Sequence, residues 1–497
     1  MNVLLINPSC GFQPVMKSSP LGLLSIATYL KERGYDVRLY DRKLGKLSPR
    51  KAVQGFPPDA VGVSVASTAD ICDGVRISRW FRARGIPVIW GGQFSSVAPK
   101  TILREGGADY VVIKEGEITF LELLQAIETK GEAARVKGIV YLEPSGGMRL
   151  TPPRELADLA GFPGIDWSFI NLPDYFYPDP KMGCERMLNL YSSKGCPGHC
   201  SFCYNKNFNH SQCRKRPNGL VVGEMQELAA KYGMDGITFV DEDMFGAGKD
   251  DMRDFCRRLR ALDLNVKWRC FSRVASFSRE DLSMLYDAGC RMIFFGIESG
   301  SPETLRRMRK NLDLTAVEDA IHACNEAGIM TTLSFVLGFP DETEGQLRET
   351  IRLMRRLESA MNTLMVLAYV PIPHTEAYSE LVEAGRLPEA RPLREWGRIQ
   401  LREDISESFS EMSEREFHVI QAYFYWRIFR RKSRRPDEDG AGQREYIHSR
   451  IASSLRNILR QSLSGMCEWA LSAAKFFLTI AWYAHAYPGI RKKYGLD

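Results

Sequence analysis

Residues 193–204 read Ser-Lys-Gly-Cys-Pro-Gly-His-Cys-Ser-Phe-Cys-Tyr and place three cysteines in a C-x3-C-x2-C spacing. Cys196, Cys200 and Cys203 fall on a short segment with glycine and proline, a composition that favours a loop. Thiolates are the ligands of iron–sulfur clusters, and three of them leave one iron of a four-iron cluster open. The spacing therefore predicts a [4Fe–4S] cluster with one iron free to bind another ligand.

Two alternatives concern this loop. Cys213 lies ten residues after Cys203 and could supply a fourth thiolate, which would make a closed structural site. His199 lies inside the loop and could ligate iron, or it could tune the cluster by hydrogen bonding. The spacing itself fits neither the ferredoxin pattern nor the paired C-x2-4-C pattern of zinc sites.

Phe202 and Tyr204 flank the last cysteine, and the resulting C-x3-C-x-aromatic-C pattern resembles the signature of the radical S-adenosylmethionine (SAM) superfamily. In that superfamily the open iron chelates the amino and carboxylate groups of SAM. The reduced cluster then cleaves SAM to a 5′-deoxyadenosyl radical. The resemblance implies SAM as a cofactor and a flavodoxin- or ferredoxin-type reductant as a partner.

Strands and helices alternate through residues 186–385, and the cysteine loop follows the first of these strands. About six such units predict a partial TIM-type (β/α)6 barrel, with reactive loops at the carboxyl ends of the strands. The predicted strands are Met187–Tyr191, Gly236–Val240, Lys267–Phe271, Met292–Gly296, Thr331–Leu337 and Thr363–Tyr369.

Polar residues and glycines follow several of these strands. Residues 296–301 (Gly-Ile-Glu-Ser-Gly-Ser) resemble the superfamily's motif that places the SAM ribose, and residues 338–340 resemble its adenine turn. His374 stands where the superfamily usually has glycine. The resemblance, together with position at strand ends, gives the predicted SAM contacts Phe202, Asp241, Glu242, Asp243, Arg273, Glu298, Ser299 and Gly338. The sequence assigns no catalytic residue.

Residues 1–135 also alternate strand and helix, which predicts a doubly wound parallel sheet with its ligand at the carboxyl ends of the strands. The small-residue loops at those ends resemble the cobalamin-binding domain that precedes many radical SAM domains. The predicted cobalamin contacts are Ser64, Ser67, Thr68, Gly91, Gly92, Glu115 and Gly116. The first histidine of the chain is His199, so cobalamin would be held without a histidine from this domain. A flavodoxin-like domain that binds nothing is the alternative.

The rest of the chain carries less chemistry. Residues 136–185 predict a hairpin and a linker that crosses the surface, and residues 386–497 predict a helical region. Trp469–Tyr487 is apolar but interrupted by Lys475, which favours a covering or membrane-interface helix over a span. A net charge of +6 over 497 residues gives no argument for nucleic acid. Twelve cysteines without a secretory signal predict a reducing cytoplasm, with peripheral membrane contact as a second hypothesis.

The leading functional hypothesis is a cobalamin-dependent radical SAM methyltransferase that acts on an unactivated carbon of a small-molecule or lipid-like substrate. The alternative keeps the domains and changes the outcome to oxidative cyclisation, ring rearrangement or carbon–carbon coupling. A methylthiotransferase is disfavoured, because that class brings a second three-cysteine cluster and only Cys10 and Cys72 precede residue 184. A non-catalytic corrinoid sensor would have no use for the three-cysteine loop.

Overall fold

The computed structural model describes residues 1–9, 18–45, 48–143, 145–274, 277–397, 409–433 and 488–496. They divide into two compact units. The first unit comprises Met1–Tyr177, Leu188–Leu264 and Pro371–Leu401. The second comprises Pro178–Met187, Asn265–Val370 and the described residues after 401.

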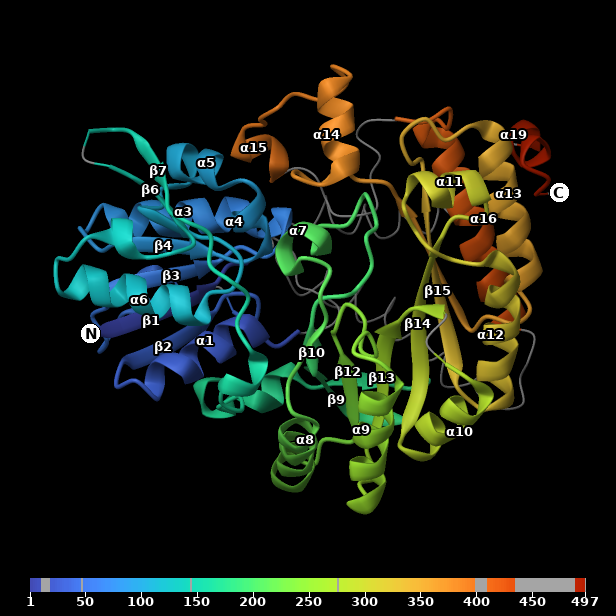
Figure 1. The fold of residues 1–497 in the computed structure, drawn as a ribbon, viewed down its shortest axis with the longest axis horizontal. Helices are drawn as coiled ribbons and strands as arrows, with labels where there is room; N and C mark the ends of the chain where they lie inside the picture. The colour runs from blue at the N-terminus through green and yellow to red at the C-terminus, as the bar shows by residue number, and fades with distance from the viewer. Residues whose placement is uncertain are drawn as a thin grey trace, which may run out of the picture. The chain divides into compact units, whose positions relative to one another are not determined.

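A seven-stranded sheet organises the N-terminal part of the first unit (Figure 1). Its order is β2-β1-β3-β4-β5-β6-β7, and the first five strands are parallel. The strands are β1 Asn2–Asn7, β2 Asp36–Asp41, β3 Ala60–Ser64, β4 Val88–Gly91, β5 Tyr110–Val112, β6 Ile139–Leu142 and β7 Met148–Leu150. The chain reverses its direction of travel across the sheet at β1, so a crevice is expected at the carboxyl ends of β1 and β3. The predicted doubly wound sheet and the predicted antiparallel hairpin of β6 and β7 are both confirmed.

Helices α1 (Leu21–Lys31) and α6 (Glu117–Glu128) share one apolar core with this sheet. In α1 the buried residues Leu23, Ala27 and Leu30 recur at helical spacing, so they form a single apolar stripe. The remaining helices and short turns are α2 Pro49–Ala52, η1 Thr68–Asp70, α3 Ile71–Arg82, α4 Gln93–Val97, α5 Pro99–Thr101, η2 Ile102–Gly106 and η3 Ala133–Arg135.

A second seven-stranded sheet has the order β16-β15-β14-β13-β12-β9-β8. Its strands are β8 Tyr177–Asp179, β9 Cys184–Leu190, β12 Gly236–Phe239, β13 Lys267–Ser272, β14 Cys290–Glu298, β15 Met330–Leu337 and β16 Thr363–Ala368. From β13 to β16, neighbours in the chain are parallel neighbours in the sheet. Helices alternate with the strands: α8 Asn218–Tyr232, α9 Lys249–Ala261, α10 Arg279–Asp287, α11 Pro302–Arg307, α12 Leu314–Glu326, α13 Glu344–Leu357 and α14 Glu376–Glu383. This alternation confirms the predicted partial barrel.

The segment before β8 corrects one prediction. Its three short 3-10 helices, η4 Leu159–Gly161, η5 Trp167–Phe169 and η6 Leu172–Tyr175, do not simply cross the surface. Trp167 and Tyr175 are buried, and Trp167 Nε1 donates to Glu224 of α8 at 2.9 Å. The Tyr175 hydroxyl donates to Asp41 at the end of β2, also at 2.9 Å. These aromatic side chains are buried, but their spacing along the chain has no helix or strand periodicity that the sequence could reveal.

The C-terminal region is helical where it is described, with α15 Leu393–Trp396, α16 Glu414–Ser433 and α19 Pro488–Lys493. The apolar stretch Trp469–Tyr487 and Cys10 lie outside the described residues. Within the described part of the chain, no helix combines the length and apolarity that a membrane crossing requires.

Candidate functional site

The three cysteines lie on the loop that follows β9. The Gly198 amide donates to Cys196 Sγ at 3.3 Å. A β-carbon on Gly198 would lie 3.4 Å from Cys196 Sγ and 3.9 Å from Cys200 Sγ, so both sulfurs lie on the same side of the loop. All three cysteines, Cys203 included, are half-buried and none is in a disulfide. The loop therefore presents its thiols to a ligand instead of burying them.

A hairpin that the sequence did not predict closes this loop at its base. Strands β10 (Ser193–Lys194) and β11 (Arg214–Lys215) pair antiparallel, with Lys194 opposite Arg214. Gly195 follows β10 with φ +92°, and a β-carbon there would lie only 2.0 Å from the carbonyl oxygen of Gln212. Glycine is required at this position, because any side chain would meet backbone.

The donor set fits a four-iron cluster with three protein ligands. Burial raises the pKa of the Cys213 thiol to about 11, and Cys213 Sγ lies 3.8 Å from the Asp243 carbonyl oxygen. His199 is exposed. Among the described residues, no group of three or more His, Cys, Asp or Glu side chains has the geometry of a single-ion site. A cluster places its thiolates on separate irons, and the three loop cysteines are the ligands that would hold it.

The acidic run after β12 divides between two environments. Asp241 is buried and accepts hydrogen bonds from the Ser192 amide at 3.0 Å and the Ser192 hydroxyl at 2.7 Å. The neighbouring Glu242 is exposed and accepts from the Gly195 amide at 2.9 Å. Asp243 is buried. Asp241 therefore anchors the start of the hairpin, and Glu242 is the carboxylate left open to a ligand.

The predicted SAM contacts in the second unit are largely engaged by their own surroundings. Glu298, at φ +69° where the register of β14 shifts, pairs with Lys310 at 3.0 Å. The fully buried Ser299 hydroxyl lies 2.9 Å from Thr350 Oγ1. Arg273 donates to the Asn311 carbonyl at 3.5 Å.

Gly338 has φ +81°, and its amide donates to Glu342 at 2.9 Å. Glu342 is completely buried, and burial raises its pKa to about 7. This carboxyl group therefore holds the predicted adenine turn in place from inside the fold.

A cavity of about 300 Å³ opens within the first unit. Five of the predicted cobalamin contacts line it: Ser64, Gly91, Gly92, Glu115 and Gly116. Gly91 faces open space, since a β-carbon there would have no heavy atom within 4 Å. By contrast Ser67 is bonded to Asp70 at 3.1 Å and Thr68 is buried, and neither belongs to this lining. The cavity is therefore open at Gly91 and lined by small residues at the ends of β3 and β4.

Residues from both sides of the cysteine loop line the same cavity, which sequence reasoning did not foresee. They are Tyr191, Ser193, Lys194, Phe208, Asn209, Val240 and Glu242. Lys114 also lines it, and Lys114 Nζ lies 2.8 Å from His210 Nε2. Burial lowers the pKa of both groups, and the nearby charge of Lys114 lowers that of His210 further. Apart from Glu242, no local sequence signal marks these residues, because only the tertiary fold brings them to the N-terminal sheet.

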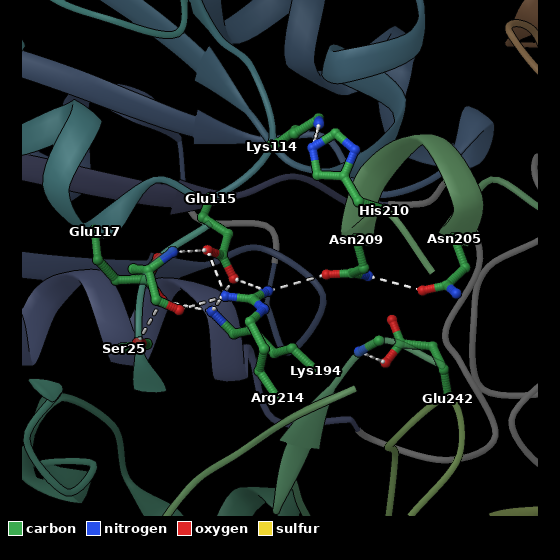
Figure 2. A network of polar contacts seen from close by, with 12 residues as sticks. Ser25, Lys114, Glu115, Glu117, Lys194, Asn205, Asn209, His210, Arg214 and Glu242 are labelled. Atoms are coloured by element: carbon green, nitrogen blue, oxygen red, sulfur yellow. Dashed lines mark hydrogen bonds and ion pairs between the residues drawn. The ribbon is translucent and has the colours of Figure 1, made fainter. Parts of the chain in front are cut away.

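Figure 2 shows how charges are balanced at the cavity wall. Lys194 Nζ lies 2.9 Å from Glu117 and 3.5 Å from Glu115. Burial alone would raise the pKa of Glu117, but Lys194 and the Ser25 hydroxyl outweigh it and keep that pKa below its usual range. Burial would lower the pKa of Lys194, but Glu117 and other neighbours outweigh it and raise that pKa. Both groups are therefore charged at neutral pH.

Two sequence families match the chain. Residues 14–124 match the B12 binding domain, and residues 190–354 match the radical SAM superfamily. The uncharacterized methyltransferase PH0819 of Pyrococcus horikoshii is 29% identical over 346 residues, which cover 68% of this chain and 73% of that protein. The anaerobic magnesium-protoporphyrin IX monomethyl ester cyclase of Rubrivivax gelatinosus is 27% identical over 396 residues, covering 77% and 70%.

A solved structure shows the same fold. The radical SAM methyltransferase TsrM from Kitasatospora setae, with tryptophan substrate and a SAM analog bound, matches with a TM-score of 0.67 at 22% identity. The match covers 77% of this chain and 76% of that one. The chain therefore combines a B12-binding domain with a radical SAM domain, and the cofactors of these two domains are a [4Fe–4S] cluster, SAM and cobalamin.

Proposed function

We propose that this enzyme transfers a methyl group from SAM, by way of cobalamin, to an unactivated carbon of a small-molecule or lipid-like substrate. When bound, the cluster and SAM supply a 5′-deoxyadenosyl radical for hydrogen abstraction, and cobalamin carries the methyl group. Cys196, Cys200 and Cys203 hold the cluster. Gly91 faces open space in the cavity proposed for the corrin ring, and Gly92 lines the same cavity.

One observation supports this proposal above the others. A single cavity, inside one compact unit, is lined both by the loops of the B12-binding domain and by residues that flank the cysteine loop. A methyl carrier seated there would lie beside the residues that hold the radical source. The 29% identity with a protein named as a methyltransferase favours methyl transfer as the outcome.

Among the predicted SAM contacts, Glu242 has the strongest structural support. It lies at the cavity and its carboxylate binds the Gly195 amide beside the first cysteine. Phe202, Asp243, Arg273, Glu298 and Gly338 are proposed as SAM contacts on the sequence resemblance alone. A flavodoxin- or ferredoxin-type reductant is the proposed electron donor.

The cyclase of Rubrivivax gelatinosus supports a second candidate, a radical SAM cyclisation that moves no methyl group. The two candidates differ in the fate of the SAM methyl carbon. A label on that carbon therefore separates them.

The deciding experiment incubates the reconstituted protein anaerobically with methyl-labelled SAM, reductant, cobalamin and an extract of its host. We expect a labelled product together with 5′-deoxyadenosine, as measured by mass spectrometry. Cys200→Ala should abolish both, whereas Cys72→Ser, at an exposed cysteine outside the loop, should retain both. A changed substrate that carries no label would contradict methyl transfer and favour cyclisation.

A further inference from the structure

The hairpin that closes the cysteine loop brings two positive charges face to face. Its strands β10 and β11 contain two residues each, and in one of the two facing pairs, Lys194 with Arg214, both residues are cationic. Like charges directly opposite each other destabilise a strand pair, and a two-stranded ribbon is marginal by itself. Other groups must therefore hold this hairpin closed.

Two carboxylates of the B12-binding domain supply the negative charge that offsets these two cations. Arg214 binds Glu115 with both arms of its guanidinium, at 2.8 and 3.0 Å, and Lys194 binds Glu117 at 2.9 Å. Glu115 and Glu117 are nearly buried, with side chains 10% and 4% exposed. The bidentate pair of Arg214 with Glu115 is geometrically specific, so residues 115–117 hold the hairpin in one arrangement.

From the hairpin the contacts continue through Asn209 to Asn205 (Figure 2). Arg214 donates to Asn209 Oδ1 at 3.1 Å, and Asn209 donates to Asn205 Oδ1 at 2.9 Å. Asn205 in turn donates to the Cys196 carbonyl oxygen at 2.7 Å. Both asparagines are buried on the short helix α7 (Asn205–Asn209), which follows the cysteines and precedes β11.

The other end of this chain of contacts forms the cavity wall. Glu115, Glu117, Lys194 and Asn209 all line the cavity, and so does Ser25, whose hydroxyl donates to Glu117 at 2.7 Å. A ligand in the cavity therefore meets the same side chains that hold the hairpin. The cavity and the cysteine loop share one set of charged groups.

We propose that Glu115, Glu117, Lys194 and Arg214 couple corrinoid binding to the conformation of the cysteine loop. They act as positioning residues: a corrinoid in the cavity stabilises the closed hairpin, and a cluster in the loop stabilises the same arrangement of the cavity wall. This inference rests on the cobalamin of the proposed function but is independent of methyl transfer. Coupling of this kind is reciprocal, so either ligand must change the affinity for the other by the same factor.

The test measures the affinity for hydroxocobalamin by absorbance titration, without SAM, in cluster-free and in cluster-reconstituted protein. We expect the cluster to tighten corrinoid binding about tenfold in the unaltered protein, within the usual range of coupling energies. Lys194→Met should reduce this ratio to about one, and Lys194→Arg should restore part of it. Arg154→Met is the matched control, because the partners of Arg154 are Thr119 and Glu122 of the same helix α6.

The outcomes separate this inference from its alternatives. Glu117→Gln provides a second variant if Lys194→Met fails to fold. A ratio of one in the unaltered protein, or a tenfold ratio retained in both variants, would overturn the coupling. An equal loss of the ratio in Arg154→Met would reduce the effect to general stability and also overturn it. Failure of every form to bind hydroxocobalamin would contradict the cobalamin function as well, whereas an unlabelled product contradicts only methyl transfer.

Discussion

The two regions predicted to bind cofactors use their polar residues in different ways. In the first unit, Glu115 and Glu242 line a cavity while Glu115 also binds Arg214 and Glu242 the Gly195 amide. In the second unit, Glu298 is hydrogen-bonded to Lys310 and Ser299 to Thr350, and all four residues belong to that unit. Both sets come from loops at the carboxyl ends of parallel strands, where ligands are expected.

The difference shows that a polar residue at a strand end has two distinct uses. It can face a ligand, or it can satisfy backbone and side-chain groups that the strand end leaves buried. The neighbours Asp241 and Glu242 show both uses in one sequence. Four experiments, in order of decreasing expected effect, test whether the division between the two regions holds.

The largest effect is expected at Gly195 in the first unit. Gly195→Ala places a β-carbon against the Gln212 carbonyl at a positive φ, so the hairpin must open. We expect a loss of at least about 3 kcal/mol in unfolding free energy and little bound iron, measured by denaturant titration and iron analysis. Gly223→Ala in α8 has open space and should be neutral or stabilising. Normal iron content in Gly195→Ala would show that the loop does not depend on the hairpin.

A pH effect should appear in the second unit at Glu342. Burial raises its folded pKa to about 7, so the folded state retains a proton that the unfolded state releases above about pH 4.5. Stability from this group is therefore lost as pH rises from about 4.5 to 7. Glu342→Gln cannot ionise and should remove up to about 3 kcal/mol of that loss, measured by urea unfolding at pH 5 and pH 8. Glu303→Gln, at an exposed residue, should leave the loss of stability between pH 5 and pH 8 unchanged. The same loss in Glu342→Gln as in the unaltered protein would contradict the raised pKa of Glu342.

Ser299 tests the internal use of polar residues directly. Ser299→Ala leaves the Thr350 hydroxyl and the Ser301 amide without this partner, and should cost about 1–2 kcal/mol of unfolding free energy. Thr350→Val breaks the same pair from helix α13 and is the matched variant. SAM affinity, measured by equilibrium binding to cluster-loaded protein, should be equal in the two variants. Weaker binding in Ser299→Ala alone would return Ser299 to the SAM site that its motif implies.

The smallest effect on the fold is expected at Gly91 in the open region. Because Gly91 has no neighbour within 4 Å of a β-carbon, Gly91→Phe should fill the cavity without straining the backbone. We expect cobalamin affinity to fall at least about tenfold, equivalent to about 1.4 kcal/mol, with an unchanged unfolding midpoint. Gly91→Ala should have a much smaller effect. Equal affinity in Gly91→Phe would show that the corrin ring does not occupy this cavity.

The sequence predicted the alternating architecture of both sheets, because apolar strands and helix spacing are local patterns. It also pointed to Gly91 and Gly92, which line a cavity, because ligands of such sheets bind at the carboxyl ends of the strands; their contact with cobalamin stays a prediction. It did not reveal the hairpin of Lys194 and Arg214, whose two-residue strands carry no periodicity. Nor could it distinguish Asp241 from Glu242, since adjacent residues point to opposite sides and only packing decides which side is filled.

The buried aromatic residues before β8 have a consequence for how this protein can be divided. Trp167 and Tyr175 attach their segment to Glu224 of α8 and to Asp41 of the first sheet, so this stretch acts as a fixed brace within the first unit. A fragment that ends before this brace would expose apolar surface that the whole chain covers, and should be prone to aggregation. The cobalamin domain of this enzyme is therefore not expected to behave as a detachable module, in domain exchange between relatives or in the laboratory.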